Sequence, residues 1–69
     1  MEEVVFVVEQ EPAGGYVATA TGHAIVTQAD SEAELRTMVR DAVQCHFDPD
    51  QRPRRIRLQF VRAEVIAAE

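Results

Sequence analysis

The sequence predicts a single α+β domain, residues 1–69, in which a four-stranded sheet carries one helix on one face. Three stretches lead to this fold class. Asp30–Phe47 repeats apolar residues at three- and four-residue spacing, which is typical of an amphipathic helix. Glu3–Gln10 is rich in β-branched residues, and Arg55–Val61 alternates apolar with polar residues, so both favour strands. With two shorter strands between them, the expected element order is β-β-β-α-β.

The first three strands form a predicted meander. Glu3–Gln10 is apolar on both of its faces. Residues 12–15, Pro-Ala-Gly-Gly, predict a turn because two consecutive glycines can adopt positive φ. Tyr16–Thr21 then returns as the second strand of a hairpin. Gly22-His23 interrupts the pattern, and Ala24–Gln28 is expected to be a short third strand.

The predicted helix has recognisable start and stop signals. Ser31 followed by Glu34 forms a capping box, in which each side chain can satisfy an amide of the first turn. Glu32 and Arg36 add an ion pair at i,i+4 spacing. Asp48-Pro49 ends the helix, because the residue before a proline is disfavoured in the α region. The apolar face consists of Leu35, Met38, Val39, Ala42, Val43 and, at its end, His46/Phe47.

The fourth strand, Arg55–Val61, is expected to be half-buried, with Phe60 pointing into the core. Val65-Ile66 either extends this strand or forms a short tail. A right-handed crossover from the third strand places the fourth strand beside the first, in spatial order 3-2-1-4. One helix covers only one face of this sheet. The other face, with Val5, Val7 and Val61, would stay in contact with water, so we expect a homo-oligomer, most simply a two-fold dimer.

The composition limits the partners, the disulfides and the location that can be expected for the domain. The net charge is −5, which disfavours general nucleic-acid binding and makes DNA an unexpected partner. The charge is uneven, because residues 1–50 carry −8 and residues 51–69 carry +3. One cysteine excludes an internal disulfide. The longest apolar run is too short to span a membrane and the start, Met-Glu-Glu, does not resemble a signal peptide, so a cytoplasmic location is expected.

Residue chemistry indicates no active site, metal site or cofactor. His23 could act as a general base or a ligand, but a half-exposed turn histidine fits the pattern better. Cys45-His46 offers two ligands that project about 100° apart on a helix, whereas a structural zinc site needs four. Cys45 is expected to be at least partly buried. We therefore expect a protein that is not an enzyme.

The arginines near the C-terminus allow two interpretations. Arg55 and Arg57 share one face of the fourth strand, and Arg54 precedes it. They either protect an edge strand and pair with the N-terminal acids, or form a docking surface for an acidic protein or an RNA backbone. In the docking interpretation the partner-binding residues are Arg54, Arg55, Arg57 and His23. Stacking on single-stranded RNA is poorly supported, because there is little aromatic interleaving. RNA binding through the phosphate backbone stays open.

Several of these signals together resemble the HicB-like antitoxin fold family. They are Glu-Gln-Glu-Pro-Ala-Gly-Gly-Tyr-Val-Ala-Thr-Ala (residues 9–20), Gly22-His23, Thr27, Ala29-Asp30-Ser31 and the Glu34-Leu35 start of the helix. The resemblance covers residues 3–62. It implies a truncated ribonuclease-H-like sheet without nuclease carboxylates, and a domain that neutralises a small HicA-like mRNA-cleaving toxin by binding it.

The chain departs from that family in two places. Members often carry a proline and an aspartate before the glycine and a cysteine after it, where this chain has Thr19-Ala20-Thr21-Gly22-His23. Antitoxins usually append a DNA-binding domain, so this chain is expected to be a short, stand-alone member. Two functions follow as expectations: a non-catalytic interaction module that masks a protein partner, or a stand-alone homo-oligomer that binds RNA or a small ligand.

Overall fold

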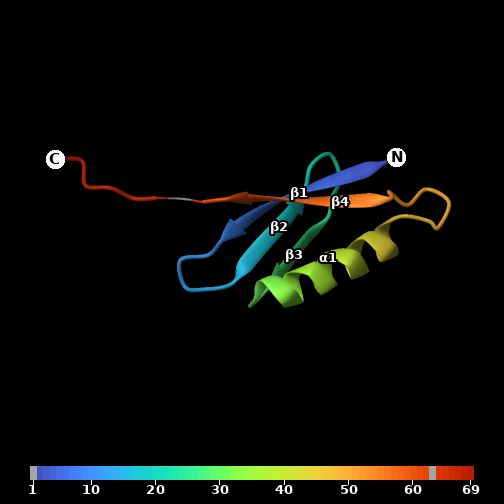
Figure 1. Ribbon diagram of the computed structural model, residues 1–69, viewed down its shortest axis with the longest axis horizontal. Coiled ribbons are helices and arrows are strands. Elements are labelled where there is room, and N and C mark those ends of the chain that lie inside the picture. The colour runs from blue at the N-terminus through green and yellow to red at the C-terminus, as the bar shows by residue number, and fades with distance from the viewer. Residues whose placement is uncertain (1, 63) are drawn as a thin grey trace.

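The computed structural model describes residues 2–62 and 64–69, and it confirms the α+β class and the element order (Figure 1). The strands are β1 (Glu3–Gln10), β2 (Tyr16–Ala20), β3 (Val26–Ala29) and β4 (Arg55–Val61), and the helix is α1 (Glu32–His46). The third strand begins two residues later than expected and ends one residue later. Every predicted element is present.

The sheet has the order β3-β2-β1-β4 that the crossover rule predicts. β1 lies inside the sheet, antiparallel to β2 and parallel to β4. The β1–β2 turn uses the two expected glycines, with φ of +100° at Gly14 and +93° at Gly15. A Cβ on Gly15 would lie 3.1 Å from the carbonyl oxygen of Ala29, so this turn also depends on the absence of a side chain.

The expected capping residues start α1. Ser31 is the N-cap, and its Oγ accepts a hydrogen bond from the amide of Glu34 at 3.1 Å. The Glu34 carboxylate reaches back to the amide of Asp30, one residue before the N-cap, at 3.0 Å. Glu32 and Arg36 form the expected ion pair at 3.3 Å. The helix therefore begins where side chains replace the missing backbone partners.

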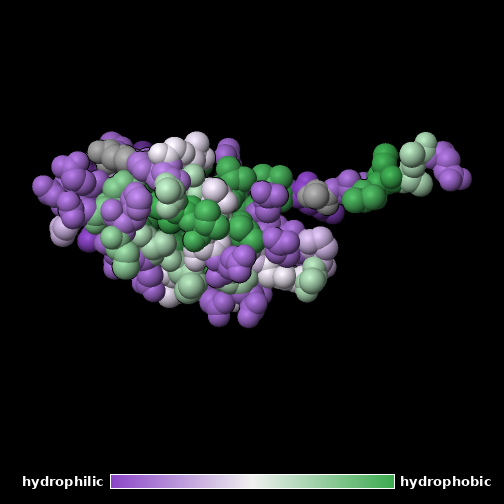
Figure 2. All heavy atoms as spheres, turned by 180° about the vertical axis from the view of Figure 1, so that it is seen from behind, coloured by the Kyte–Doolittle hydropathy of each residue, from purple (hydrophilic) through white to green (hydrophobic). Residues whose placement is uncertain are grey.

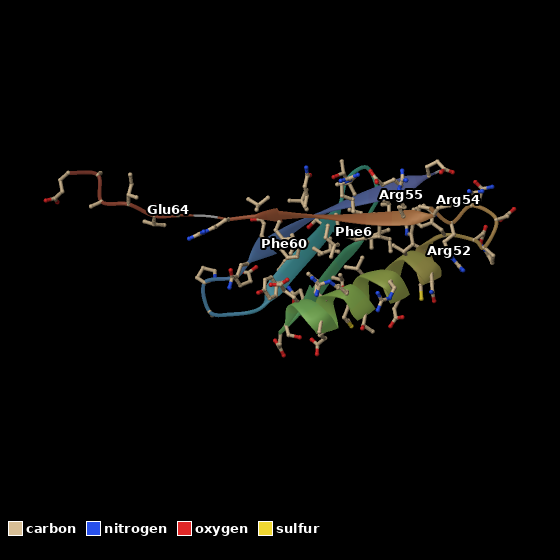
Figure 3. All side chains as sticks on the ribbon, viewed as in Figure 1. Phe6, Arg52, Arg54, Arg55, Phe60 and Glu64 are labelled. Carbon is tan, nitrogen blue, oxygen red and sulfur yellow. The ribbon has the colours of Figure 1, made fainter. Side chains whose placement is uncertain are left out.

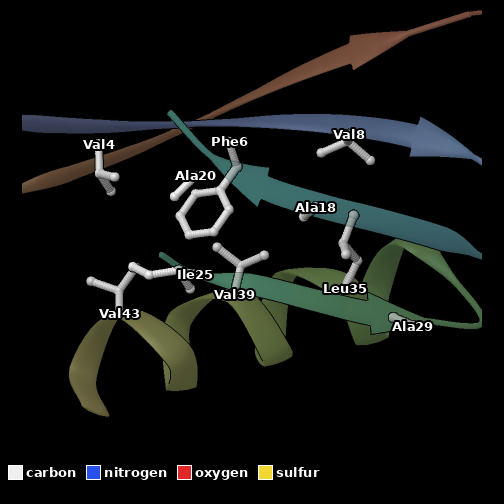
Figure 4. Close-up of a cluster of buried hydrophobic side chains, with 10 residues drawn as sticks. All are labelled: Val4, Phe6, Val8, Ala18, Ala20, Ile25, Ala29, Leu35, Val39 and Val43. Atoms are coloured by element: carbon white, nitrogen blue, oxygen red, sulfur yellow. The ribbon is translucent and has the colours of Figure 1, made fainter. Parts of the chain in front are cut away.

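One side of the sheet and one face of α1 make up the hydrophobic core (Figure 4). Phe6 and Leu35 are fully buried and project into the core from opposite layers. Alanines on β2 and β3 contribute small side chains, which let the helix approach these strands closely. The core consists of Val4, Phe6, Val8, Ala18, Ala20, Ile25, Ala29, Leu35, Val39 and Val43.

The helix does not cover the sheet evenly. It packs against β3 and β2, and it leaves the side chains of β4 on the same face partly open. Ile56 and Leu58 are half-buried, and Phe60 exposes 50% of its surface. The expectation that Phe60 points into the core is therefore wrong. Its ring lies on the helix side of β4, but it rests edge-on against Tyr16, with ring centroids 6.5 Å apart (Figure 3).

Beyond β4, the segment Glu64–Glu69 projects away from the body (Figure 1). The molecule is accordingly long in one direction, with extents of 54 × 20 × 17 Å. Val65 is 96% exposed and Ile66 is 77% exposed. Figure 2, from behind, shows hydrophobic residues gathered in the middle of the body and again along this projection. Of the two alternatives that the sequence leaves open, Val65-Ile66 forms a tail.

Candidate interaction surfaces

The sheet face turned away from α1 brings together two groups of residues that the sequence singled out separately. Residues paired directly across strands share a face, and Val5 is paired with Arg57. In the same way Val61 is paired with Glu9, and Arg55 with Glu3. We call this surface the open face. Its aliphatic members are Val5, Val7, Val17, Val26 and Val61.

The valines of the open face are covered to different extents. Val5, Val7 and Val17 are half-buried by their neighbours within the sheet, whereas Val26 is 64% exposed and Val61 48% exposed. Polar residues alternate with them, since Val7 lies between Thr19 and Gln59 in the strand register. The result is an aliphatic strip with a polar margin, which is the composition of a protein-binding surface more than of a catalytic cleft.

One end of the open face carries an ion-pair cluster. Arg57 donates two hydrogen bonds to the Glu3 carboxylate, from Nε and Nη2, each of 3.1 Å. Arg55 lies 3.5 Å from the same carboxylate. The hydrogen bonds from Arg57 are the main cause of a lowered pKa of Glu3; partial burial opposes them, and the charges of Arg57 and Arg55 add to them. The same contact raises the pKa of Arg57.

This cluster predicts a pH-dependent contribution to stability. A carboxyl group whose pKa is lowered by folding stabilises the fold above its unfolded pKa, and the contribution disappears as pH falls through the folded value. The unfolded value for Glu3 is near 4.5. We therefore expect Arg57→Gln to lower the urea midpoint slightly at pH 7, because exposed pairs contribute little. The difference in urea midpoint between wild type and Arg57→Gln should vanish well below pH 4.5. A midpoint difference that grows on acidification would contradict this.

Arg54 and Arg52 make their contacts outside this cluster. Arg54 is 3.6 Å from Glu2, and both side chains are largely exposed. Arg52 donates to the carbonyl oxygens of Gln44 at 3.1 Å and Phe47 at 3.5 Å, so it caps the C-terminal end of α1. Figure 3 shows Arg55 on the far side of the sheet from the helix and Arg52 near the helix end. The C-terminal arginines therefore do not form one patch.

A groove between α1 and β4 is a second candidate surface, which was not among those predicted from the sequence. It consists of a cavity of about 340 Å³ beside Pro53 and Ile56 and one of about 200 Å³ beside Ile56 and Leu58. The floor is aliphatic and the rim is basic: Arg36, Arg40, Arg52 and Arg54. Arg36 and Arg40 stand one helical turn apart beside the apolar stripe, a signal that was available in the sequence. No local signal places Arg52 there.

His23 packs against the C-terminal end of α1. Its ring contacts those of Phe47 and His46, with centroids 5.0 Å and 5.9 Å away. The helix end and the β2–β3 loop thus share a small aromatic cluster. Across residues 2–62 and 64–69, no group of three or more His, Cys, Asp and Glu side chains could hold a metal ion. Cys45 is exposed, so the expectation of partial burial is wrong.

Comparison with known proteins gives two relatives that carry the same family name. A UPF0150 protein of Archaeoglobus fulgidus is 52% identical over 54 residues, covering 78% of this chain and 80% of the relative. A UPF0150 protein of Thermotoga maritima is 38% identical over 66 residues, covering 96% and 93%. No family model matches the chain, and no solved structure matches it. Within the described residues, no helix is long and apolar enough to cross a membrane. At this identity and coverage, the chain belongs to the UPF0150 family.

Proposed function

We propose that this chain is a non-catalytic interaction module that binds and masks a protein partner through the open face. The observation that carries the proposal is the strip of half-buried and exposed valines bordered by Glu3, Arg55 and Arg57. A dehydrated centre with a charged margin gives both affinity and orientation to a protein interface. The resemblance to HicB-like antitoxins supports a small RNA-cleaving toxin of the HicA kind as the partner.

The charge of the chain fits that partner. A protein that binds RNA presents a basic surface, and this chain carries a net charge of −5. Residues 1–50, which supply three of the four strands and the helix, carry a net charge of −8. Long-range attraction would therefore accelerate encounter with a basic toxin and oppose encounter with RNA itself. The toxin would be masked when its RNA-binding surface is covered.

Charge placed in the valine strip tests the proposal. The candidate toxin is a small protein encoded beside this chain, and the assay is host growth when both are expressed together. Val7→Asp should abolish rescue of growth, because it buries a carboxylate in the interface. Val26→Asp, at the most exposed valine of the face, should do the same without disturbing the fold. The matched control is Thr37→Asp on the exposed side of α1. Full rescue by both valine variants would refute the open face as the binding site.

The second candidate function is a homo-oligomer that binds RNA or a small ligand and has no toxin partner. The observation that favours it is the exposed valine strip itself, since a 69-residue chain without a disulfide gains stability by covering such a surface with a second copy. Fluorescence anisotropy with labelled RNA separates the candidates. Binding that falls steeply with salt and is lost in Arg55→Glu/Arg57→Glu would favour this second function.

A further inference from the structure

The groove between α1 and β4 has features that partner binding at the open face does not explain. Its floor is formed by Ile56 and Leu58, which are half-buried although they face the helix side of the sheet. The smaller cavity alone measures about 200 Å³. A cavity of about 150 Å³ lined by aliphatic groups is enough to bind benzene. One aliphatic side chain therefore fits over Leu58, and the larger cavity beside Pro53 accepts another.

The rim of the groove is strongly basic. Arg36 and Arg54 each face one carboxylate of their own chain, Glu32 and Glu2. Among the residues that the structure describes, Arg40 and Arg52 form no ion pair with a carboxylate, and the Nε atom of Arg52 is buried without a hydrogen-bond partner. The groove thus suits an occupant with aliphatic side chains between acidic ones.

The projecting tail has this chemistry. Its sequence from residue 64 is Glu-Val-Ile-Ala-Ala-Glu, two aliphatic side chains with an acid at each end. Val65 and Ile66 are the most exposed large hydrophobic residues among those described. Two exposed aliphatic residues side by side on a projecting segment cost free energy unless another surface covers them.

We propose that the tail Glu64–Glu69 of one copy docks into the α1–β4 groove of a second copy. Val65 and Ile66 cover the floor at Ile56 and Leu58, and the tail carboxylates face the arginine rim. The tail does not dock into the groove of its own chain. This groove opens beside the first residues of β4, whereas the tail leaves from the last ones and continues away from the body (Figure 1). The tail can reach the groove of a second copy without reversing its direction.

The position of β4 supports this geometry. β4 is an edge strand of the sheet, so no further strand separates the groove from an approaching tail. Two copies related by a two-fold axis would exchange tails reciprocally, and the contact would be made twice. This interface is distinct from the open face, so it is compatible with a partner bound there.

Sedimentation velocity over a concentration series measures the contact in solution. We expect the wild type to self-associate, and Val65→Asp/Ile66→Asp to raise the dissociation constant about tenfold or more, because two buried aliphatic groups are lost. Both residues are exposed, so the fold of the variant should be unchanged by circular dichroism. Arg40→Glu should also weaken association, and high salt should weaken the wild type.

Disulfide cross-linking locates the contact directly. In a Cys45→Ser background, Ile66→Cys and Leu58→Cys should link chains carrying different tags when the two are mixed. Ile66→Cys with Val17→Cys, on the open face, is the matched control and should not link. Three results would overturn the proposal: a wild type that stays monomeric, association that survives Val65→Asp/Ile66→Asp and is lost in Val7→Asp, or a cross-link that forms only within one chain.

Discussion

Replacing Phe6 by alanine is expected to destabilise the fold by about 3–5 kcal/mol, the usual cost of removing a fully buried aromatic ring. Phe6 has no exposed surface, and it occupies the centre of β1, between β2 and β4 and beneath α1. A domain of this size has a free energy of unfolding of about 3–10 kcal/mol. The variant should therefore be largely unfolded, or close to the midpoint of its unfolding transition, at 25 °C. Urea denaturation followed by circular dichroism measures this.

Phe60→Ala is the matched control for this prediction. Phe60 has the same side chain on the same face of the sheet, but it is 50% exposed because α1 does not cover the end of β4. Its loss should cost about 1–1.5 kcal/mol, half or less of the Phe6 value. Equal effects at the two positions would mean that the helix lies centrally over the sheet, contrary to the structure.

A charge buried on the core-facing side of the helix should also lower the free energy of unfolding strongly. Val39 is 1% exposed and projects from the middle of α1 into the core. Val39→Asp either buries an unpaired carboxylate or forces it to remain protonated, at a cost of several kcal/mol. We expect no cooperative unfolding transition at pH 7 and partial recovery of helical circular dichroism at low pH, where the aspartate is neutral.

Met38→Asp separates burial from helix propensity. Met38 is adjacent in sequence and 41% exposed, and the substitution introduces the same residue into the same helix. It should cost about 1 kcal/mol or less and leave a normal transition. If Met38→Asp proved as damaging as Val39→Asp, the face of α1 that contacts the sheet would be wrongly assigned.

Local signals were enough to predict the elements and their order. Ser31 and Glu34 mark the start of α1, and the two glycines after Pro12 mark the first turn. The parallel pairing of β1 with β4 follows from the handedness of the crossover, which is a property of all such connections. These features depend on residues close in sequence or on general topology, so a single sequence carries them.

The position of the helix on the sheet was not predictable in the same way. It depends on the sizes of side chains that meet across layers: alanines at 18, 20 and 29 admit the helix over β2 and β3, whereas bulkier residues of β4 remain at the side. This lateral offset exposes Phe60 and creates the groove lined by Arg40 and Ile56. Predicting it requires the packed core, which no local pattern encodes.

The predicted partner-binding residues lie on different surfaces, for a related reason. Arg55 and Arg57 share the open face with Val5 and Val7, as strand alternation implies. Arg54, one residue earlier, belongs to the groove, and His23 belongs to the aromatic cluster at the end of α1. Strand periodicity could place the first two arginines. It could not place a loop histidine, whose neighbours come from a helix end more than twenty residues away.

We proposed that the open face is the part of this protein that binds its partner. Isothermal titration calorimetry with the purified partner tests it most directly, by comparing wild type, Val7→Asp and the control Thr37→Asp. We expect Val7→Asp to raise the dissociation constant at least about tenfold and Thr37→Asp to leave it unchanged. Equal affinity of Val7→Asp and wild type, with loss of binding in Thr37→Asp, would place the partner on the helix side and refute the open face as the binding site.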